Sequence, residues 1–279
     1  MQFLLSRINQ PDRSKVEESE HSFQKEARQS VLPFVVPRLR ANEVHLWALT
    51  PDAESTAEYT SLLSPTEVER ARRFRFPALF ERFVSDHGRL RLLLAAYLQA
   101  DPQSLQFVQN VQGKPRLSGP DCRLRFNMSH TRGLTMIAVC LDAELGIDVE
   151  VLRRLEERDE IAAAHFAPLE KKDLQAQPAE ERDAAFLRCW TRKEAYIKAH
   201  GEGLSLGLDR FAVTLADQDR AALVHCDWDE NEPDRWMLHH LQPMAGYIGA
   251  LAIEQGAWSL RPFTWPASNH FSQAPVDKL

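Results

Sequence analysis

The sequence has no long hydrophobic run. Its longest apolar stretches are residues 92–98 and 134–141, whereas a helix that spans a bilayer needs about 20 apolar residues. Residues 1–7 contain only three consecutive apolar side chains, too few for the apolar core of a signal peptide. We therefore predict a cytosolic protein that has no membrane partner.

The sequence is also poor in cysteine, with 4 cysteines among 279 residues. None belongs to a C-x-x-C pair or has a histidine at ligand spacing, which argues against a disulfide framework and against a zinc site. We expect small core or surface residues at these positions, which are Cys122, Cys140, Cys189 and Cys226.

An excess of positive charge is absent as well. The chain has 34 Lys and Arg against 40 Asp and Glu, a net charge of -6, so the charge balance does not favour nonspecific binding to nucleic acid or to an anionic membrane. The hydrophobic content of 44% is that of a packed globular protein. A chain of this length forms one large domain or two small ones.

Periodicity and turn residues predict an α+β protein with an N-terminal extension (1–41), two α+β halves (42–145 and 146–258) and a C-terminal tail (259–279). Ser64 with Glu67 is typical of a helix start, and Gly201 of a helix end. We expect strands 123–128, 134–141 and 146–152 to be neighbours in one sheet. The order of helices and strands recurs once in each half, without a residue-level repeat. Helices are predicted at 64–73, 82–99, 160–175 and 179–200, and further strands at 43–49, 211–215, 236–241 and 247–253.

Two carboxylates alternate with apolar residues in the strand predicted at 146–152. Asp148 and Glu150 therefore project from the same face of the strand. Oxygen ligands at this spacing suit Mg²⁺, which commonly takes one or two carboxylates together with phosphate oxygens and water. A solvent-facing strand of alternating polarity explains the same pattern.

A predicted helix carries a second set of polar residues. Trp190, Glu194 and Lys198 follow one another at four-residue steps and share one helix face. The carboxylate would serve as a metal ligand or base, and the ammonium would bind phosphate. Glu before Lys at this spacing is also an ordinary helix-stabilising pair, worth about 0.3–0.5 kcal/mol.

Ser129 and His130 lie at the end of a predicted strand, followed by a loop. Both side chains could donate hydrogen bonds to a phosphate, and a turn with a solvated histidine is the alternative. A serine hydrolase is a poor explanation, because the flanks lack the G-x-S-x-G turn.

Two basic segments could bind an anion. Lys114 stands beside Pro115 in a loop, and Arg70 belongs to an arginine cluster on a predicted helix. Arginine forks suit phosphate, yet the exposed face of an amphipathic helix has the same composition.

Taken together and in this order, these motifs resemble the signature of the Sfp-type 4'-phosphopantetheinyl transferases. The resemblance runs from about residue 43 to about residue 253, and the motifs are more specific jointly than singly. It implies two similar α+β halves related by a pseudo-twofold axis, with the active site in the cleft between them. The motifs are Gly113-Lys114-Pro115, Phe126-Asn127-Met128-Ser129-His130, Gly146-Ile147-Asp148-Val149-Glu150, and Trp190-Thr191-Arg192-Lys193-Glu194-Ala195-Tyr196-Ile197-Lys198 followed by Gly201, Gly203 and Leu204.

The resemblance also implies roles for single residues. Lys198 would contact the diphosphate of coenzyme A, and Arg70 falls near a basic phosphate contact of the family. The chain departs from the family there, because it has arginines and Glu67 where relatives often have lysines. Asp148, Glu150 and Glu194 would hold Mg²⁺, and Lys114, Ser129 and His130 would bind the nucleotide and its phosphates.

The implied reaction transfers the 4'-phosphopantetheine group of coenzyme A to a serine of an apo acyl or peptidyl carrier protein and releases adenosine 3',5'-bisphosphate. Either Glu194 or a water molecule beside the metal would take the serine proton. Carrier proteins are generally acidic, and this chain is acidic as well. Docking would therefore use local basic and apolar patches, for which Arg75, Arg123 and Arg125 are candidates. A monomer is expected.

Two other functions remain possible on the residues alone. One is a different Mg-dependent phosphodiesterase that uses the same acids with water. The other is a noncatalytic carrier-protein-binding module, which the intact Asp148, Glu150, Glu194 and Lys198 disfavour.

Overall fold

The computed structural model describes residues 36–51, 56–119, 122–215 and 221–265. Two sheets lie at its centre, one with strand order β11-β1-β5-β4 and one with order β6-β10-β9. The first sheet contains β1 (Glu43–Leu49), β4 (Leu124–Thr131), β5 (Leu134–Leu141) and β11 (Ser259–Thr264). The second contains β6 (Leu145–Val151), β9 (Trp236–Leu241) and β10 (Tyr247–Glu254).

The remaining elements of the described segments are helices and two short pairs of antiparallel strands. The helices are α2 (Thr56–Leu62), α3 (Pro65–Arg72), α4 (Pro77–Leu98), α5 (Arg158–His165), α6 (Pro168–Ala176), α7 (Arg182–His200) and α8 (Glu232–Arg235). These pairs join β2 (Phe107–Gln109) to β3 (Pro115–Leu117), and β7 (Phe211–Val213) to β8 (Leu223–Cys226). This mixture confirms the predicted α+β class.

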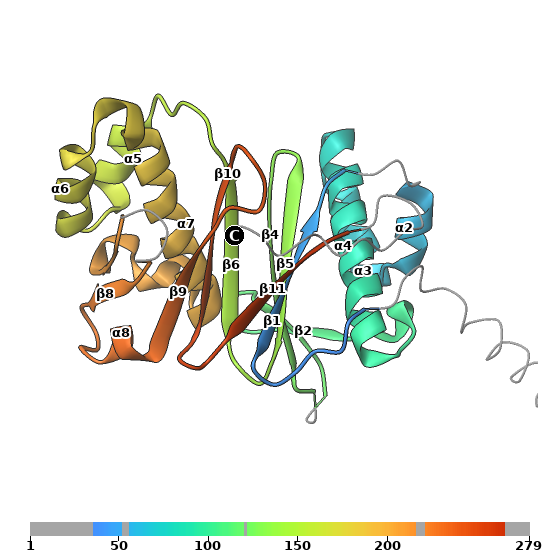
Figure 1. The fold of residues 1–279 in the computed structure, drawn as a ribbon. Coiled ribbons are helices and arrows are strands. Elements are labelled where there is room, and N and C mark those ends of the chain that lie inside the picture. The colour runs from blue at the N-terminus through green and yellow to red at the C-terminus, as the bar shows by residue number, and fades with distance from the viewer. Residues whose placement is uncertain (1–35, 52–55, 120–121, 216–220, 266–279) are drawn as a thin grey trace, which may run out of the picture.

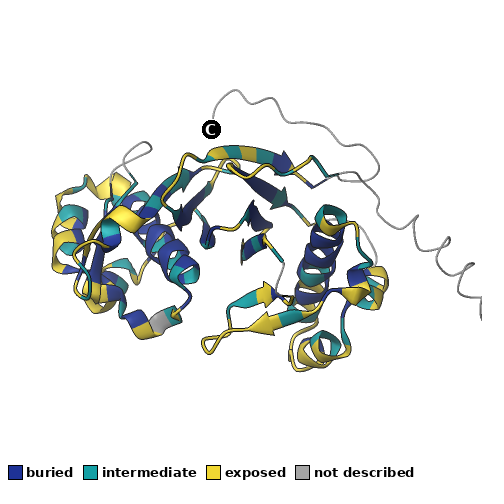
Figure 2. Cartoon of the chain, turned by 90° about the horizontal axis from the view of Figure 1, so that it is seen from below, coloured by how far each residue is buried: buried dark blue, intermediate teal, exposed yellow. Residues whose placement is uncertain are grey.

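The elements form four layers, with α4 and α7 outside and the two sheets between them (Figure 1). Alternating side chains explain this order. On β1, Trp47 packs toward α4, while its neighbour Leu46 packs into the core between the sheets. Buried residues accordingly concentrate in the strands and on α4 and α7 (Figure 2).

Three strands of the first sheet have the same order as the three strands of the second. In the first half β1 pairs with β5 and β5 pairs with β4, and in the second β6 pairs with β10 and β10 pairs with β9; all four pairs are antiparallel. In each half a long helix, α4 or α7, lies between the first strand and the other two in the sequence. The recurrence of helices and strands predicted from the sequence is therefore present in the fold.

The residues predicted to cap two helices do so in the structure. Ser64 Oγ accepts a hydrogen bond from the Glu67 amide at 3.3 Å, and the Glu67 carboxylate accepts one from the Ser64 amide at 2.8 Å. This reciprocal capping box starts α3. At the end of α7, Gly201 adopts φ 86°, which a residue with a side chain rarely adopts.

Several expectations from the sequence need correction. Strand β6 does not join the sheet of β4 and β5 but belongs to the second sheet, because its partner β10 comes from far along the chain. The helix expected at 160–175 is two helices, α5 and α6, separated before Pro168, which begins α6.

The prediction of a C-terminal tail is also wrong for its first residues. Residues 259–264 form β11, which pairs in parallel with β1 at the edge of the first sheet, so the chain returns to the N-terminal half. Residues 266–279 and most of the predicted N-terminal extension lie outside the described residues. In the described part of the chain, no helix is both long and apolar enough to cross a membrane.

Candidate active site

The site lies where the two sheets meet along β4 and β6. The side chain of Asn127 on β4 accepts a hydrogen bond from the backbone amide of Ile147 on β6 at 2.9 Å. The two strands consequently lie side by side although they belong to different sheets. Ser129 and His130 lie near the end of β4, as expected, and the strand continues through Thr131, one residue into the loop that we predicted.

Helix α7 approaches β6 closely, and a glycine makes this possible. A Cβ atom at Gly146 would lie 2.2 Å from the carbonyl oxygen of Ala195 and 2.3 Å from the amide nitrogen of Ala199, distances at which atoms overlap. Gly146 shares a strand face with Asp148 and Glu150. The contact therefore brings α7, with Glu194 and Lys198, against the acidic face of β6.

Asp148 is the centre of the polar cluster. Its Oδ1 accepts hydrogen bonds from Ser129 Oγ at 2.8 Å and from Lys198 Nζ at 2.6 Å. Lys198 Nζ also lies 3.1 Å from Ser129 Oγ and donates to the Ile147 carbonyl at 3.3 Å. Asp148 is only 5% exposed, and its Oδ2 is buried without a partner. A buried carboxylate oxygen without a hydrogen bond is costly unless a cation satisfies it.

Glu150 and Glu194 complete the acidic group. Burial and the charge of Asp148 raise the pKa of Glu150, whose carboxylate accepts a hydrogen bond from Thr131 Oγ1 at 3.0 Å. Burial, followed by the charge of Asp148, also raises the pKa of Glu194, with a further contribution from Glu150. Within the described residues, no hydrogen-bond donor reaches the Glu194 carboxylate.

The charges of this group suit a divalent cation. The carboxylates of Asp148, Glu150 and Glu194 lie near one another and near the ammonium of Lys198. Neighbouring negative charges destabilise one another. As the side chains lie, no three His, Cys, Asp or Glu residues of the described segments are close enough together to enclose a metal ion. The unpartnered Asp148 Oδ2 and the free Glu194 carboxylate are nevertheless the oxygen donors that Mg²⁺ prefers.

His130 lies beside this group and contacts helix α4. Its Nδ1 is 3.9 Å from the carboxylate of Asp86, which also accepts a hydrogen bond from Thr135 Oγ1 at 2.7 Å. Burial lowers the pKa of His130, while the charge of Asp86 opposes this effect. We did not predict Asp86 from the sequence, although an aspartate among the apolar positions of an amphipathic helix is a signal that could have found it.

Two of the predicted basic residues are not part of this cluster. Lys114 Nζ donates to Glu144 at 2.7 Å and to the carbonyl of Ala199 at 2.9 Å, so its ammonium is held at the end of α7. Arg70 is exposed on α3, and its guanidinium lies 5.4 Å from the centre of the Phe83 ring.

The other residues of the α7 motif have structural contacts. Trp190 is partly buried, stacks on Phe186 and packs against the core that surrounds α7, so it does not accompany Glu194 and Lys198 into the site. Lys193 is fully buried, pairs with Glu170 at 2.8 Å and donates to two carbonyls of the segment that leads into β7. These contacts hold α7 in position while Glu194 and Lys198 face β6.

Comparison with known proteins shows the family of this chain. The chain is 33% identical to 4'-phosphopantetheinyl transferase HetI of Nostoc sp. over 231 residues, which cover 81% of this chain and 93% of the relative. It belongs to the 4'-phosphopantetheinyl transferase superfamily. The resemblance seen in the sequence is thereby confirmed.

The profile of the 4'-phosphopantetheinyl transferase superfamily matches residues 144–252 of this transferase. That segment contains Asp148, Glu150, Glu194 and Lys198, whereas Ser129 lies before it. The transferase is also 31% identical to 4'-phosphopantetheinyl transferase Sfp of Bacillus subtilis over 171 residues, or 61% of this chain and 74% of that relative.

Proposed function

We propose that this transferase moves the 4'-phosphopantetheine group of coenzyme A onto a serine of an apo acyl or peptidyl carrier protein and releases adenosine 3',5'-bisphosphate. Membership of the superfamily supports the reaction class. The single observation that carries the proposal at the level of residues is the contact between Asp148 on β6 and Lys198 on α7, with Glu150 and Glu194 beside it.

Asp148, Glu150 and Glu194 are the residues that would hold Mg²⁺. Their excess of negative charge and the buried, unpartnered Asp148 Oδ2 support this assignment. When bound, Mg²⁺ would offset negative charge on the diphosphate of coenzyme A. Glu150 and Glu194 are only partly buried, so their side chains have room to rotate toward Asp148 and close the ligand set.

Lys198, Ser129 and His130 would bind and orient the phosphates. The serine oxygen of the carrier attacks the phosphorus that carries pantetheine, and the bond from this phosphorus to the leaving bisphosphate breaks, so negative charge grows on the leaving oxygen. The Lys198 ammonium would stabilise that charge. Ser129 Oγ, 3.1 Å from Lys198 Nζ, and His130 would fix the nucleotide end.

The proton of the attacking serine needs an acceptor. Glu194 has oxygens that no described donor engages. A carboxylate within hydrogen-bond reach of the attacking hydroxyl can accept its proton. We therefore assign the acceptor role to Glu194, in addition to its role as a ligand.

The equal order of three strands in each half supports a pseudo-twofold arrangement with the site at the junction of the halves. Two halves packed together in one chain bury the surface that a symmetric dimer would bury between two copies. We therefore propose a monomer. Lys114 and Arg70 remain proposed contacts for the nucleotide and its phosphates. For Lys114 this role requires release from Glu144.

The three arginines considered for docking of the carrier differ in their contacts. Arg123 pairs with Asp142, and Arg125 donates to the carbonyl of Cys122, so both guanidinium groups already have partners. Arg75 is exposed on the segment between α3 and α4. Of the three arginines, Arg75 is the most available to an acidic partner.

The test is incubation of the purified protein with coenzyme A, Mg²⁺ and a panel of apo acyl and peptidyl carriers, followed by intact-mass analysis of each carrier. We expect at least one carrier to gain the mass of phosphopantetheine. A phosphodiesterase would instead cleave coenzyme A without any carrier, and a noncatalytic binding module would leave both unchanged. Either result with folded protein contradicts the proposal.

A further inference from the structure

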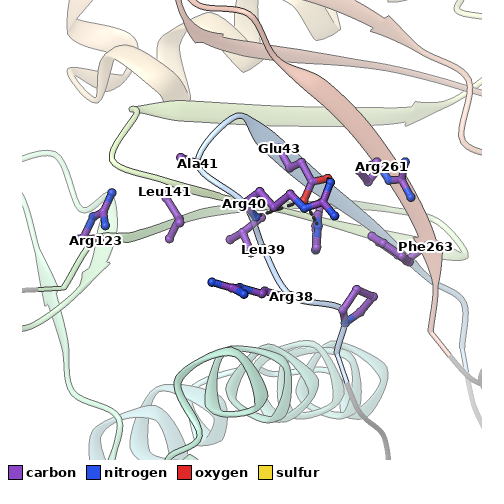
Figure 3. A pocket seen from close by; sticks show the side chains of 11 residues that line it. Arg38, Leu39, Arg40, Ala41, Glu43, Arg123, Leu141, Arg261 and Phe263 are labelled. Atoms are coloured by element: carbon purple, nitrogen blue, oxygen red, sulfur yellow. Dashed lines mark hydrogen bonds and ion pairs between the residues drawn. The ribbon is translucent and has the colours of Figure 1, made fainter.

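A cavity of about 720 Å³ is lined by residues of the first sheet and of the segment that leads into β1. Figure 3 shows its lining, with Arg38 and Arg40 from the segment before β1, Arg123 immediately before β4 and Arg261 from β11. Its volume falls in the range of small-molecule sites, about 300–1,000 Å³. Four arginines from three separate parts of the chain therefore share one cavity.

The charge of this lining is opposite to that of the protein. Four guanidinium groups and a single carboxylate, that of Glu43, border the cavity, whereas the whole chain has a net charge of -6. Glu43 Oε1 lies 3.8 Å from Arg40, and its Oε2 lies 3.5 Å from His45 Nε2. An excess of positive charge remains, which attracts an anion.

Two of the four arginines are available to a ligand. Arg123 is already paired with Asp142 and Arg40 with Glu43. Arg38 and Arg261 are exposed, and no carboxylate within the described part of the chain lies at ion-pair distance from either. A guanidinium offers a planar fork of donors that matches a phosphate or a carboxylate.

The other side of the cavity is apolar. Leu39, Leu141 and Phe263 contribute to the lining, and the Phe263 ring stacks on Trp47 with a centroid distance of 4.9 Å. Phe263 therefore has a fixed orientation. Apolar walls with a few polar groups at one side are typical of sites for small organic molecules.

We propose that this cavity binds a small organic anion, a molecule with a phosphate or carboxylate group held by Arg38 and Arg261 and an apolar body against Leu39, Leu141 and Phe263. This proposal does not depend on the transfer reaction.

The cavity is separate from the active site. Tyr97 on α4 contacts His45 of the cavity, with its hydroxyl 2.6 Å from His45 Nδ1, whereas Asp86 on the same helix contacts His130 of the active site. These two helix positions are eleven residues apart, a rise of about 16 Å. The cavity is therefore distinct from the acidic cluster, and we expect a ligand there to bind without displacing coenzyme A.

The experiment is calorimetric titration of the full chain, saturated with coenzyme A, with three probes: 1-naphthyl phosphate, 2-naphthoate and neutral 2-naphthol. We expect one equivalent of at least one anion to bind, and the naphthol to bind at least about tenfold more weakly. The preferred anion identifies the head group as phosphate or carboxylate. Because coenzyme A saturates the active site, binding here is measured independently of carrier modification.

Two variants complete the experiment. The double variant Arg38→Ala/Arg261→Ala should weaken anion binding at least about tenfold, whereas Arg154→Ala, which removes an exposed arginine outside the cavity, should leave it unchanged. Circular dichroism checks that both variants are folded. The proposal is overturned if neither anion binds, if the double variant binds as tightly as the parent, or if coenzyme A displaces the bound anion.

Discussion

The ammonium of Lys198 lies 2.6 Å from Oδ1 of Asp148, although 50 positions separate the two residues in the sequence. The contact joins α7 to β6 and leaves Oδ2 of Asp148 buried without a partner. One oxygen of this carboxylate is therefore satisfied by the protein, while the other is available to a cation.

Replacement of the acids should abolish transfer without unfolding the protein. We expect Asp148→Ala and Glu194→Ala each to lower kcat/KM for carrier modification by at least about 100-fold, because each removes a group that acts on the phosphates or on the serine proton. Glu202→Ala, at an exposed carboxylate just after α7, is the control and should retain activity. Full activity in both acid variants, measured by intact mass, would remove the assignment.

Removal of divalent cations should stop the reaction. We expect protein treated with EDTA and then desalted to lose transfer and to regain it with added Mg²⁺, because hard oxygen ligands bind this ion. Calorimetry should detect Mg²⁺ binding by the parent protein in the presence of coenzyme A and much weaker binding by Asp148→Ala. Undiminished transfer in EDTA would contradict a metal role for the three acids.

Gly146→Ala should separate α7 from β6. The added methyl group would overlap the backbone of α7 at Ala195 and Ala199, so we expect a loss of about 3 kcal/mol in the free energy of unfolding, together with loss of transfer. Gly113→Ala is the contrasting variant. Its Cβ meets no atom within 4 Å, so only the strain of a positive φ, about 1 kcal/mol, remains. Urea unfolding of both variants tests this order, and equal stability would contradict it.

The Glu67 carboxylate should make stability depend on pH. Burial pushes its pKa up, but the hydrogen bonds from Ser64 and the Arg91 guanidinium outweigh burial and leave the pKa below its ordinary value of 4.5. A lowered folded pKa stabilises the protein above pH 4.5, and this stabilisation is lost as the pH falls through the folded value. Glu67→Gln should therefore cost about 1–3 kcal/mol at neutral pH, with a smaller difference from the parent below pH 4.5.

Urea unfolding of Glu67→Gln and the parent at neutral and acidic pH measures this effect. Glu69→Gln is the matched control, because Glu69 lies on the same helix and forms only an exposed pair with Arg73, which should contribute little at any pH. A difference between Glu67→Gln and the parent that stays constant across pH 4.5 would show that the carboxylate has no lowered pKa.

Much of the site could be predicted because its signals are local. The alternation in 146–151 places Asp148 and Glu150 on one face, and the four-residue step places Glu194 and Lys198 on another. The same step also includes Trp190, which the structure packs against the core that surrounds α7. Spacing identifies a shared face but does not say which part of that face is covered by the core.

Other parts of the site had no local signal. The contact of Asp86 with His130 joins a helix to a strand that follows after a hairpin. Thr131 could not be identified as the donor to Glu150 until β4 was known to extend through it and to lie beside β6. The cavity with Arg38, Arg123 and Arg261 likewise brings together residues that are distant in the sequence.

The sequence by itself determined the α+β class, most of the long elements, the cap at Ser64 and the faces on which the acids lie, because these depend on residues within a few positions of one another. Only the tertiary structure decided that β6 leaves the sheet of β5, that β11 returns to β1 and that α7 rests on Gly146. Such pairings depend on how distant segments bury each other's apolar faces, and no local periodicity contains that information.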